Sequence, residues 1–200
     1  TYLARRTSPC GQTSCVSATV TVDAAPVAPA SISASTTLIC QADRPAELTL
    51  TAVGGAGETV EWFAGACGGD PIGSGPSVMI AAPTVTTTYF ARWTGSSCPA
   101  TACASVTVNV ADSPGTPTAV SASTSRYCAD AAPSTITLTA SGGGGDTLQW
   151  FAGDCSGTPL GTGPSLEIPA PSATTTFLAR WSTTSCGDSA CVATVVTVDP

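Results

Sequence analysis

The chain of 200 residues contains no lysine, no histidine and a single asparagine, Asn109. Without histidine it cannot form a Ser-His-Asp or Cys-His catalytic arrangement, or an imidazole site for zinc or copper. Without lysine it can form neither a Schiff base nor a lysine-to-asparagine isopeptide crosslink. No nucleophile motif or paired-carboxylate signature stands out among its Ser, Thr and Asp residues. The sequence therefore predicts no enzyme, no catalytic residues and no cofactor.

Charge is also scarce: charged residues make up 10% of the chain, and the net charge is −7. The six basic residues are scattered arginines, so the basic patch that nucleic-acid binding requires is absent. The polybasic clusters that hold proteins to anionic membranes are absent too. No apolar stretch approaches the roughly 18 residues of a membrane span. We therefore expect no nucleic-acid partner and no membrane span in this segment.

A tandem repeat is the main feature that is present. Trp-Phe-Ala-Gly-x-Cys occurs at Trp62–Cys67 and again, 88 positions later, at Trp150–Cys155. Ala91-Arg92-Trp93 recurs as Ala179-Arg180-Trp181 at the same offset. An array of one module has to be identified before any local motif is interpreted. We expect full modules at 30–111 and 118–200, proline-containing semi-rigid linkers at 24–29 and 112–117, and the C-terminal part of a preceding module at 1–23.

Short alternating runs separated by Gly, Pro and Ser clusters predict an all-β, antiparallel sandwich with no helix. A tryptophan at the centre of the third strand resembles the arrangement in immunoglobulin-like sandwiches. Trp62 and Trp150 are expected to fill the cores. Tyr89 stands where a tyrosine corner would be, but its counterpart is Phe177, so that role is optional. In the first full module the expected strands are 32–35, 48–52, 60–63, an edge piece around Ile72, 78–80, 89–93 and 106–110.

Ten cysteines, two in residues 1–23 and four in each module, indicate a disulfide framework formed in an oxidising compartment. Zinc binding by the Cys-x4-Cys spacing is the alternative, but the expected strand order puts the other cysteines of each module at the opposite pole. The same order predicts two bonds in each module, one near the first interstrand connection and one across the last hairpin. The predicted pairs are Cys10–Cys15, Cys40–Cys67, Cys98–Cys103, Cys128–Cys155 and Cys186–Cys191.

Two other groups of residues are candidate sites. Phe63 and Arg92, and likewise Phe151 and Arg180, are expected on the outer face of neighbouring strands, where each arginine stacks on its phenyl ring. This pair is either a glycan-binding face or a structural or inter-subunit patch. Exposed threonine turns are candidates for O-glycosylation, although threonine also favours strands and their ends. They are Thr86, Thr87, Thr88, Thr174, Thr175, Thr176, Thr183 and Thr184.

Two further features admit alternatives. Asp23, Asp112 and Asp199 recur at module ends, but one carboxylate per junction is far short of the ligand number of calcium, so no metal site is predicted. Residues 1–23 hold only a hairpin, which is marginally stable alone. This segment is either a cut from a longer periodic chain or a hairpin donated to a neighbouring chain.

The combined pattern resembles the bacterial immunoglobulin-like tandem repeats of large secreted surface proteins. It consists of Trp-Phe-x-Gly-x-Cys, then Thr-Thr-Thr-(Tyr/Phe)-x-Ala-Arg-Trp, then Cys-x4-Cys before a Val/Thr strand. The resemblance implies a stalk, spacer, adhesin shaft or fibre subunit, with no catalytic residues to carry over. We therefore expect an extracellular or cell-surface structural protein that self-associates or adjoins further repeats. An adhesin that binds a glycan or a host surface is the alternative.

Overall fold

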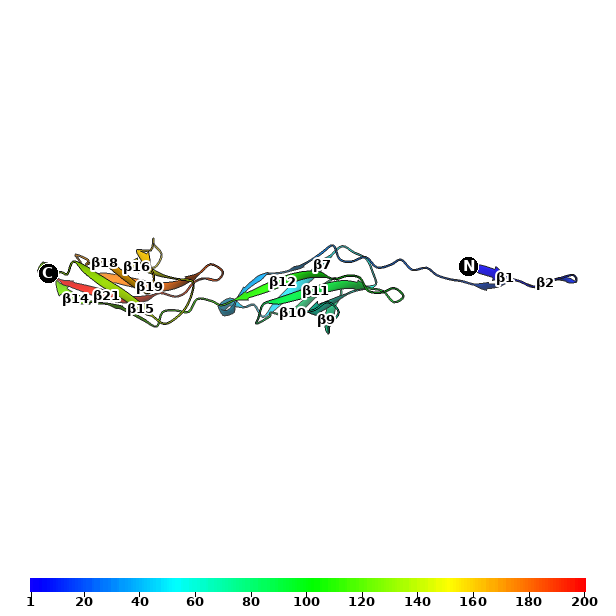
Figure 1. Ribbon diagram of the computed structural model, residues 1–200, viewed down its shortest axis with the longest axis horizontal. Coiled ribbons are helices and arrows are strands. Elements are labelled where there is room, and N and C mark those ends of the chain that lie inside the picture. Colours follow the sequence, from blue (N-terminus) through cyan, green and yellow to red (C-terminus); the bar gives the residue numbers. More distant parts are fainter. The chain divides into compact units, whose positions relative to one another are not determined.

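The computed structural model describes all residues 1–200, and its regular secondary structure is almost entirely β-strand (Figure 1). It contains a small N-terminal hairpin and two antiparallel sandwiches of the same topology. Two single-turn 3-10 helices, η1 (Gln41–Asp43) and η2 (Ala129–Ala131), are the helical elements. Both are far from the length and apolarity that a membrane-crossing helix needs. The predicted all-β fold class of tandem Ig-like sandwiches is confirmed.

The first sandwich has a three-stranded and a five-stranded sheet. The smaller sheet has the order β10 (Ser77–Ala81), β7 (Glu47–Val53), β5 (Ser31–Ala34). The larger has the order β6 (Leu38–Cys40), β12 (Ala104–Ala111), β11 (Thr87–Thr94), β8 (Thr59–Ala64), β9 (Pro71–Ser74). Each predicted strand lies within one or two residues of an observed one. The short strand β6, which pairs in parallel with β12, was not predicted.

The second sandwich repeats this arrangement. Its smaller sheet has the order β13 (Ala119–Ala122), β15 (Thr135–Ser141), β18 (Ser165–Pro169). Its larger sheet has the order β14 (Arg126–Cys128), β21 (Val192–Asp199), β19 (Thr175–Thr183), β16 (Thr147–Ala152), β17 (Gly161–Thr162), with β20 (Gly187–Asp188) added to β19.

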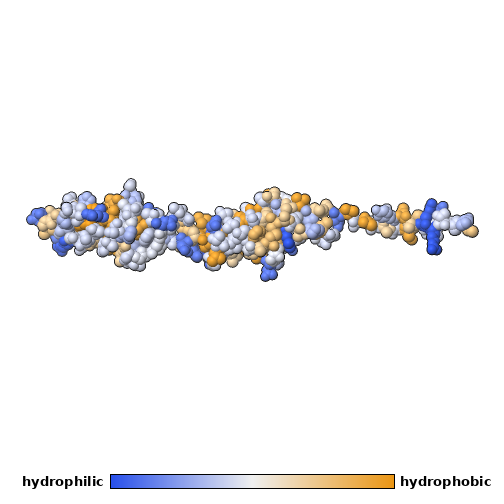
Figure 2. All heavy atoms as spheres, in the orientation of Figure 1, coloured by the Kyte–Doolittle hydropathy of each residue, from blue (hydrophilic) through white to orange (hydrophobic).

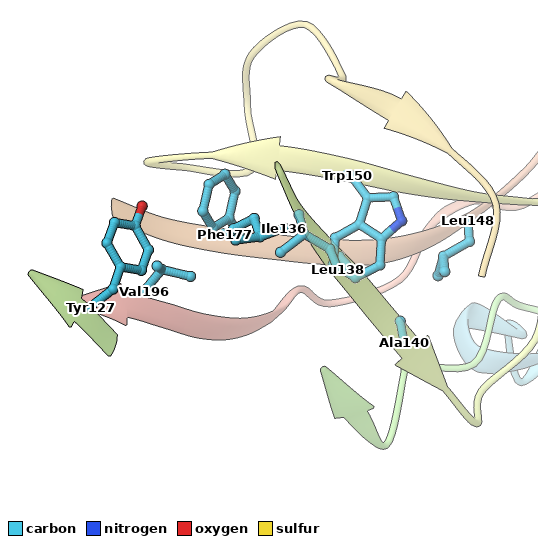
Figure 3. Close-up of a cluster of buried hydrophobic side chains, with 9 residues drawn as sticks. Tyr127, Ile136, Leu138, Ala140, Leu148, Trp150, Phe177 and Val196 are labelled. Carbon is cyan, nitrogen blue, oxygen red and sulfur yellow. The ribbon is translucent and has the colours of Figure 1, made fainter. Parts of the chain in front are cut away.

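A tryptophan lies at the centre of each core, as predicted. Trp62 and Trp150 are completely buried. In the second sandwich Trp150 packs with Leu138, Ile136 and Phe177 between the two sheets (Figure 3). Each indole N–H donates to a glycine carbonyl, Trp62 to Gly75 and Trp150 to Gly163, both at 2.8 Å. The polar edge of each ring is thereby satisfied inside an apolar core.

The linker before each sandwich is attached to the sandwich that follows it. Val27 forms a β-bridge with Ala56 in the turn between β7 and β8, and Gly115 forms one with Gly144 at the corresponding place. Gly55 lies in the first of these turns with φ +76°, and a Cβ there would approach the Trp93 indole nitrogen to 2.5 Å. Glycine is required at this position both for the left-handed conformation and for the close approach.

The N-terminal segment forms a narrow hairpin in which β1 (Tyr2–Ala4) pairs with β4 (Val16–Ala18), and β2 (Thr7–Ser8) pairs with β3 (Gly11–Gln12). Its apolar side chains have no core, since Tyr2, Leu3 and Val16 are each about 70% exposed. Strongly hydrophilic residues are few and scattered over the face of the molecule in Figure 2, in keeping with the low charge content.

Candidate functional site

An arginine covers a buried phenyl ring on the outer face of each large sheet. In the first sandwich β8 and β11 place Phe63 opposite Phe90 and Glu61 opposite Arg92. The Arg92 guanidinium carbon lies 4.9 Å from the centre of the Phe63 ring. Its NH2 is also 3.0 Å from a carboxylate oxygen of Glu61. The predicted stacking is confirmed, and the ion pair accompanies it.

The second sandwich has the same stacking, but its arginine pairs with a different carboxylate. Arg180 lies 4.8 Å from the centre of the Phe151 ring. Gln149 stands where the first sandwich has Glu61 and accepts a hydrogen bond from Arg180 Nε at 3.2 Å. The ionic partner is instead Asp188 on β20, at 2.8 Å. Sequence reasoning missed Asp188 because it lies on a short strand of the last hairpin that the alternation pattern does not reveal.

The phenyl rings cannot form the predicted interaction face. Phe63 is 2% exposed and Phe151 is 1% exposed, so neither ring is available to stack on a sugar or a partner. The reason is the loop after β8, which folds back over the outer face. A Cβ on Gly68 of that loop would lie 3.2 Å from Arg92 NH1. In the second sandwich Arg180 NH1 donates to the Cys155 carbonyl at 3.2 Å. Arginine and loop together cover the ring.

The same loop explains one class of disulfide. Cys67 bonds to Cys103 and Cys155 bonds to Cys191, each pair 36 residues apart. Ala179 of β19 faces Val192 of β21, so Cys191, the residue before β21, lies level with Arg180. The folded-back loop brings Cys155 to this level. Each bond therefore closes the loop over the arginine and its phenyl ring, on the sheet face instead of at a pole.

The other class of disulfide has a single member, Cys40–Cys186, whose cysteines are 146 positions apart in the sequence. The parallel pairing of β6 with β12 places Cys40 opposite Ala111, where the first sandwich ends and the linker begins. By compactness the chain divides into residues 1–35, 48–80 and 88–107 as one unit and residues 36–47, 81–87 and 108–200 as the other. Cys40 and Cys186 both belong to the second unit.

The structure thus corrects the predicted cysteine pairs while retaining a disulfide framework. Cys40 is carried away from Cys67 by strand β6, and Cys67 is carried away from the pole by its loop. The hairpin cysteines do not pair with each other, because Cys103 and Cys191 bond to loop cysteines. The free cysteines are Cys10, Cys15, Cys98 and Cys128. None of the pairs Cys10–Cys15, Cys40–Cys67, Cys98–Cys103, Cys128–Cys155 and Cys186–Cys191 is formed.

An open groove recurs beside the last hairpin of each sandwich. In the first sandwich it is lined by 23–26, 56–58 and 95–98. In the second it is lined by 111–115, 144–146 and 183–185. The two sets correspond at the 88-residue offset of the repeat, except for Cys98 in the first and Gly115 in the second. Two lining residues of the first groove are hydrogen-bonded: the Ser96 hydroxyl donates to Glu58, which lowers the pKa of that carboxyl below its usual range.

The acidic residues form no metal site. No group of three or more His, Cys, Asp or Glu side chains is arranged to hold a metal ion. Of the three aspartates at module ends, Asp23 and Asp112 line the grooves. Asp199 instead accepts from Arg126 at 2.6 and 2.9 Å, a contact that lowers the pKa of the carboxyl and raises that of the guanidinium.

The threonine turns are only partly open to solvent. Thr86, Thr174 and Thr184 are exposed, whereas the other five predicted threonines are half-buried. The Thr86 hydroxyl accepts from the Val110 N–H at 3.0 Å, and Thr174 accepts from Val198 in the same way. These hydroxyls satisfy backbone donors at strand ends. Glycosylation of these turns stays a prediction, and the exposed threonines are its first candidates.

Solved structures similar to the chain come from varied sources. The fibronectin(III)-like modules of Clostridium thermocellum CbhA are 14% identical, with 84% of this chain and 94% of that one covered and a TM-score of 0.45. A Ca²⁺-stabilised adhesin that helps an Antarctic bacterium bind ice is 16% identical, with 98% and 56% covered and a TM-score of 0.46. The N-terminal domains of the bacteriophage RB49 outer capsid protein Hoc are 13% identical, with 87% and 59% covered and a TM-score of 0.32. Likenesses this distant carry no information on function.

Among curated proteins none matches the chain. The family model described as an Ig-like domain associated with CHU_C matches residues 26–111 and, a second time, residues 114–200. Each match spans one sandwich together with the bridge that attaches its linker. The chain therefore belongs to the CHU_C-associated Ig-like domain family and carries two tandem copies of that domain.

Proposed function

We propose that the protein is a structural, extracellular repeat protein that contributes to a cell-surface stalk or filament. Its building units are the Ig-like repeats at 30–111 and 118–200, with the linkers 24–29 and 112–117 between units and the hairpin 1–23 as part of a further unit. Self-association and O-glycosylated threonine turns belong to the same proposal.

The Cys40–Cys186 bond is the observation that carries the proposal. A disulfide within a domain stabilises that domain, whereas this bond joins one Ig-like repeat to the next. Such a bond lets a pulling force pass from one repeat to the next without extending the chain between Cys40 and Cys186. Disulfides persist in oxidising, extracellular environments, which supports the proposed location.

The chemistry of the surface supports a structural role over ligand binding. The aromatic rings that a glycan-binding face would use are buried beneath Arg92 and Arg180. The buried residues of both repeats are hydrophobic and pack in the cores. The adhesin alternative thereby loses the phenyl rings of Phe63 and Phe151 as a binding surface.

Electron microscopy of the native material tests the proposal. We expect a beaded fibre whose repeat is one Ig-like unit, and we expect it to become more extensible when a reductant opens the disulfides. An alkylated sample that was never reduced is the matched control. Isolated, monomeric particles in native, unreduced material would contradict the proposal.

A further inference from the structure

The four free cysteines share one property. Observed bonds join positions 36 or 146 residues apart. In the 88-residue repeat, Cys128 corresponds to Cys40, Cys98 corresponds to Cys186, and Cys15 corresponds to Cys103. Each free cysteine therefore occupies a repeat position at which another copy of the repeat carries a bonded cysteine.

The groove of the second repeat shows the surroundings of Cys186, the bonded counterpart of Cys98. Cys186 follows directly after the groove residues 183–185 and is bonded to Cys40. The turn that carries Cys40 is held beside the groove, because the Ala42 N–H donates to the Ser113 hydroxyl at 2.9 Å. The sulfur atoms of Cys40 and Cys186 also lie 3.8 Å from the carbonyl oxygens of Ser185 and Ala111.

The first repeat has the same groove with its cysteine unbonded. Cys98 is half-buried in the wall formed by residues 95–98. The matching turn, Cys128 followed by η2, is exposed on the second repeat with its thiol free. One chain therefore presents both halves of the connection seen between Cys40 and Cys186, at two different places.

We propose that the groove beside Cys98 binds the Cys128-bearing turn of another copy of this chain, and that the two cysteines form a disulfide. The contact is heterologous, head to tail, so it can repeat along a series of copies. It requires only that the repeats recognise one another and stands whether or not the native material is fibrous, so the two proposals fail separately.

The bond forms by two thiol–disulfide exchanges with a small disulfide such as oxidised glutathione. The Cys128 thiolate attacks one glutathione sulfur, forms a mixed disulfide and releases one glutathione thiolate. The Cys98 thiolate then attacks the Cys128 sulfur and releases the second. Two thiol protons pass to solvent or to the glutathione thiolates, and the two electrons reduce the oxidant.

Complementary variants of the full chain test the pairing. In a Cys10→Ser/Cys15→Ser background, a Cys98→Ser chain keeps only Cys128 free, and a Cys128→Ser chain keeps only Cys98 free. In a glutathione redox buffer, each variant alone should remain monomeric on non-reducing gels. An equimolar mixture should give a covalent dimer that disappears on reduction. A dimer of either variant alone, or a mixture that stays monomeric, would overturn the proposal.

A second pair of variants tests the groove apart from the thiol. Ser97→Trp in the Cys128→Ser chain fills the groove without changing a cysteine, and Val85→Trp adds the same bulk at an exposed site outside it. We expect Ser97→Trp to abolish the mixed dimer and Val85→Trp to leave its yield unchanged. Equal yields from the two variants would show that the groove does not guide the bond.

Discussion

At the scale of single residues, each repeat places one tyrosine in the same corner of its core, but at different positions. In the second repeat Tyr127 of β14 packs with Phe177 of β19, and its hydroxyl donates to the Pro171 carbonyl (Figure 3). In the first repeat the corresponding residues are Ile39 and Tyr89, both buried. The sequence showed Tyr89 replaced by Phe177 but not that a tyrosine returns at 127, because that exchange depends on the unpredicted strands β6 and β14.

The stacked arginine is the residue whose loss we expect to be most costly on the outer face. Arg92→Ala uncovers the Phe63 ring and removes the aliphatic contacts of the arginine. It should destabilise the first repeat by about 1–2 kcal/mol, since a partly desolvated cation–π contact alone contributes about 0.5–2 kcal/mol. Urea unfolding followed by tryptophan fluorescence measures this change.

Glu61→Gln is the matched control, because the second repeat already has Gln149 at this position and keeps the stacking. This substitution removes only a half-exposed ion pair, and we expect it to cost less than about 0.5 kcal/mol. Equal losses from Arg92→Ala and Glu61→Gln would assign the loss of stability to the ion pair and would mean that the stacking contributes little.

At the scale of elements, the strands were predictable and the loops were not. Alternation in Leu48–Ala52 and the tryptophan of 60–63 identified β7, β8 and the core, because side-chain direction in a strand follows a period of two. Cysteine pairing depends on where loops travel. The loop after β8 folds over the sheet, and the three-residue strand β6 turns Cys40 toward the linker. Neither path leaves a periodic signal, so the predicted pairs were wrong although the framework was correct.

We expect the disulfide that closes the folded-back loop to contribute strongly to the stability of the first repeat. Replacing both Cys67 and Cys103 by serine removes the constraint on a loop of 36 residues. The chain-entropy model gives a loss of about 4 kcal/mol from the first repeat. Thermal unfolding by calorimetry should show its transition lowered while the second repeat is little changed. Cys98→Ser is the control, since Cys98 is free, and it should leave both transitions in place.

At the scale of the whole molecule, the two classes of disulfide act on different lengths of chain. Cys67–Cys103 and Cys155–Cys191 each close 36 residues within one Ig-like repeat. Cys40–Cys186 closes 146 residues, which include most of both repeats. A force applied at Thr1 and Pro200 therefore passes from Cys40 directly to Cys186 and bypasses the chain between them. The bond limits extension more than it limits unfolding.

Single-molecule stretching measures how far the chain extends, and the expected length depends on which disulfides are intact. At about 3.4 Å per extended residue, the reduced chain should reach about 700 Å, whereas the oxidised chain should reach only about 190 Å, from residues 1–40 and 186–200. With Cys186→Ser, the two 36-residue loops remain closed, and the same spacing predicts about 440 Å. Cys98→Ser should behave as the unaltered chain. An oxidised chain that extends as far as Cys186→Ser would mean that the bond between the repeats does not form, and the load would then pass through the folded sandwiches themselves.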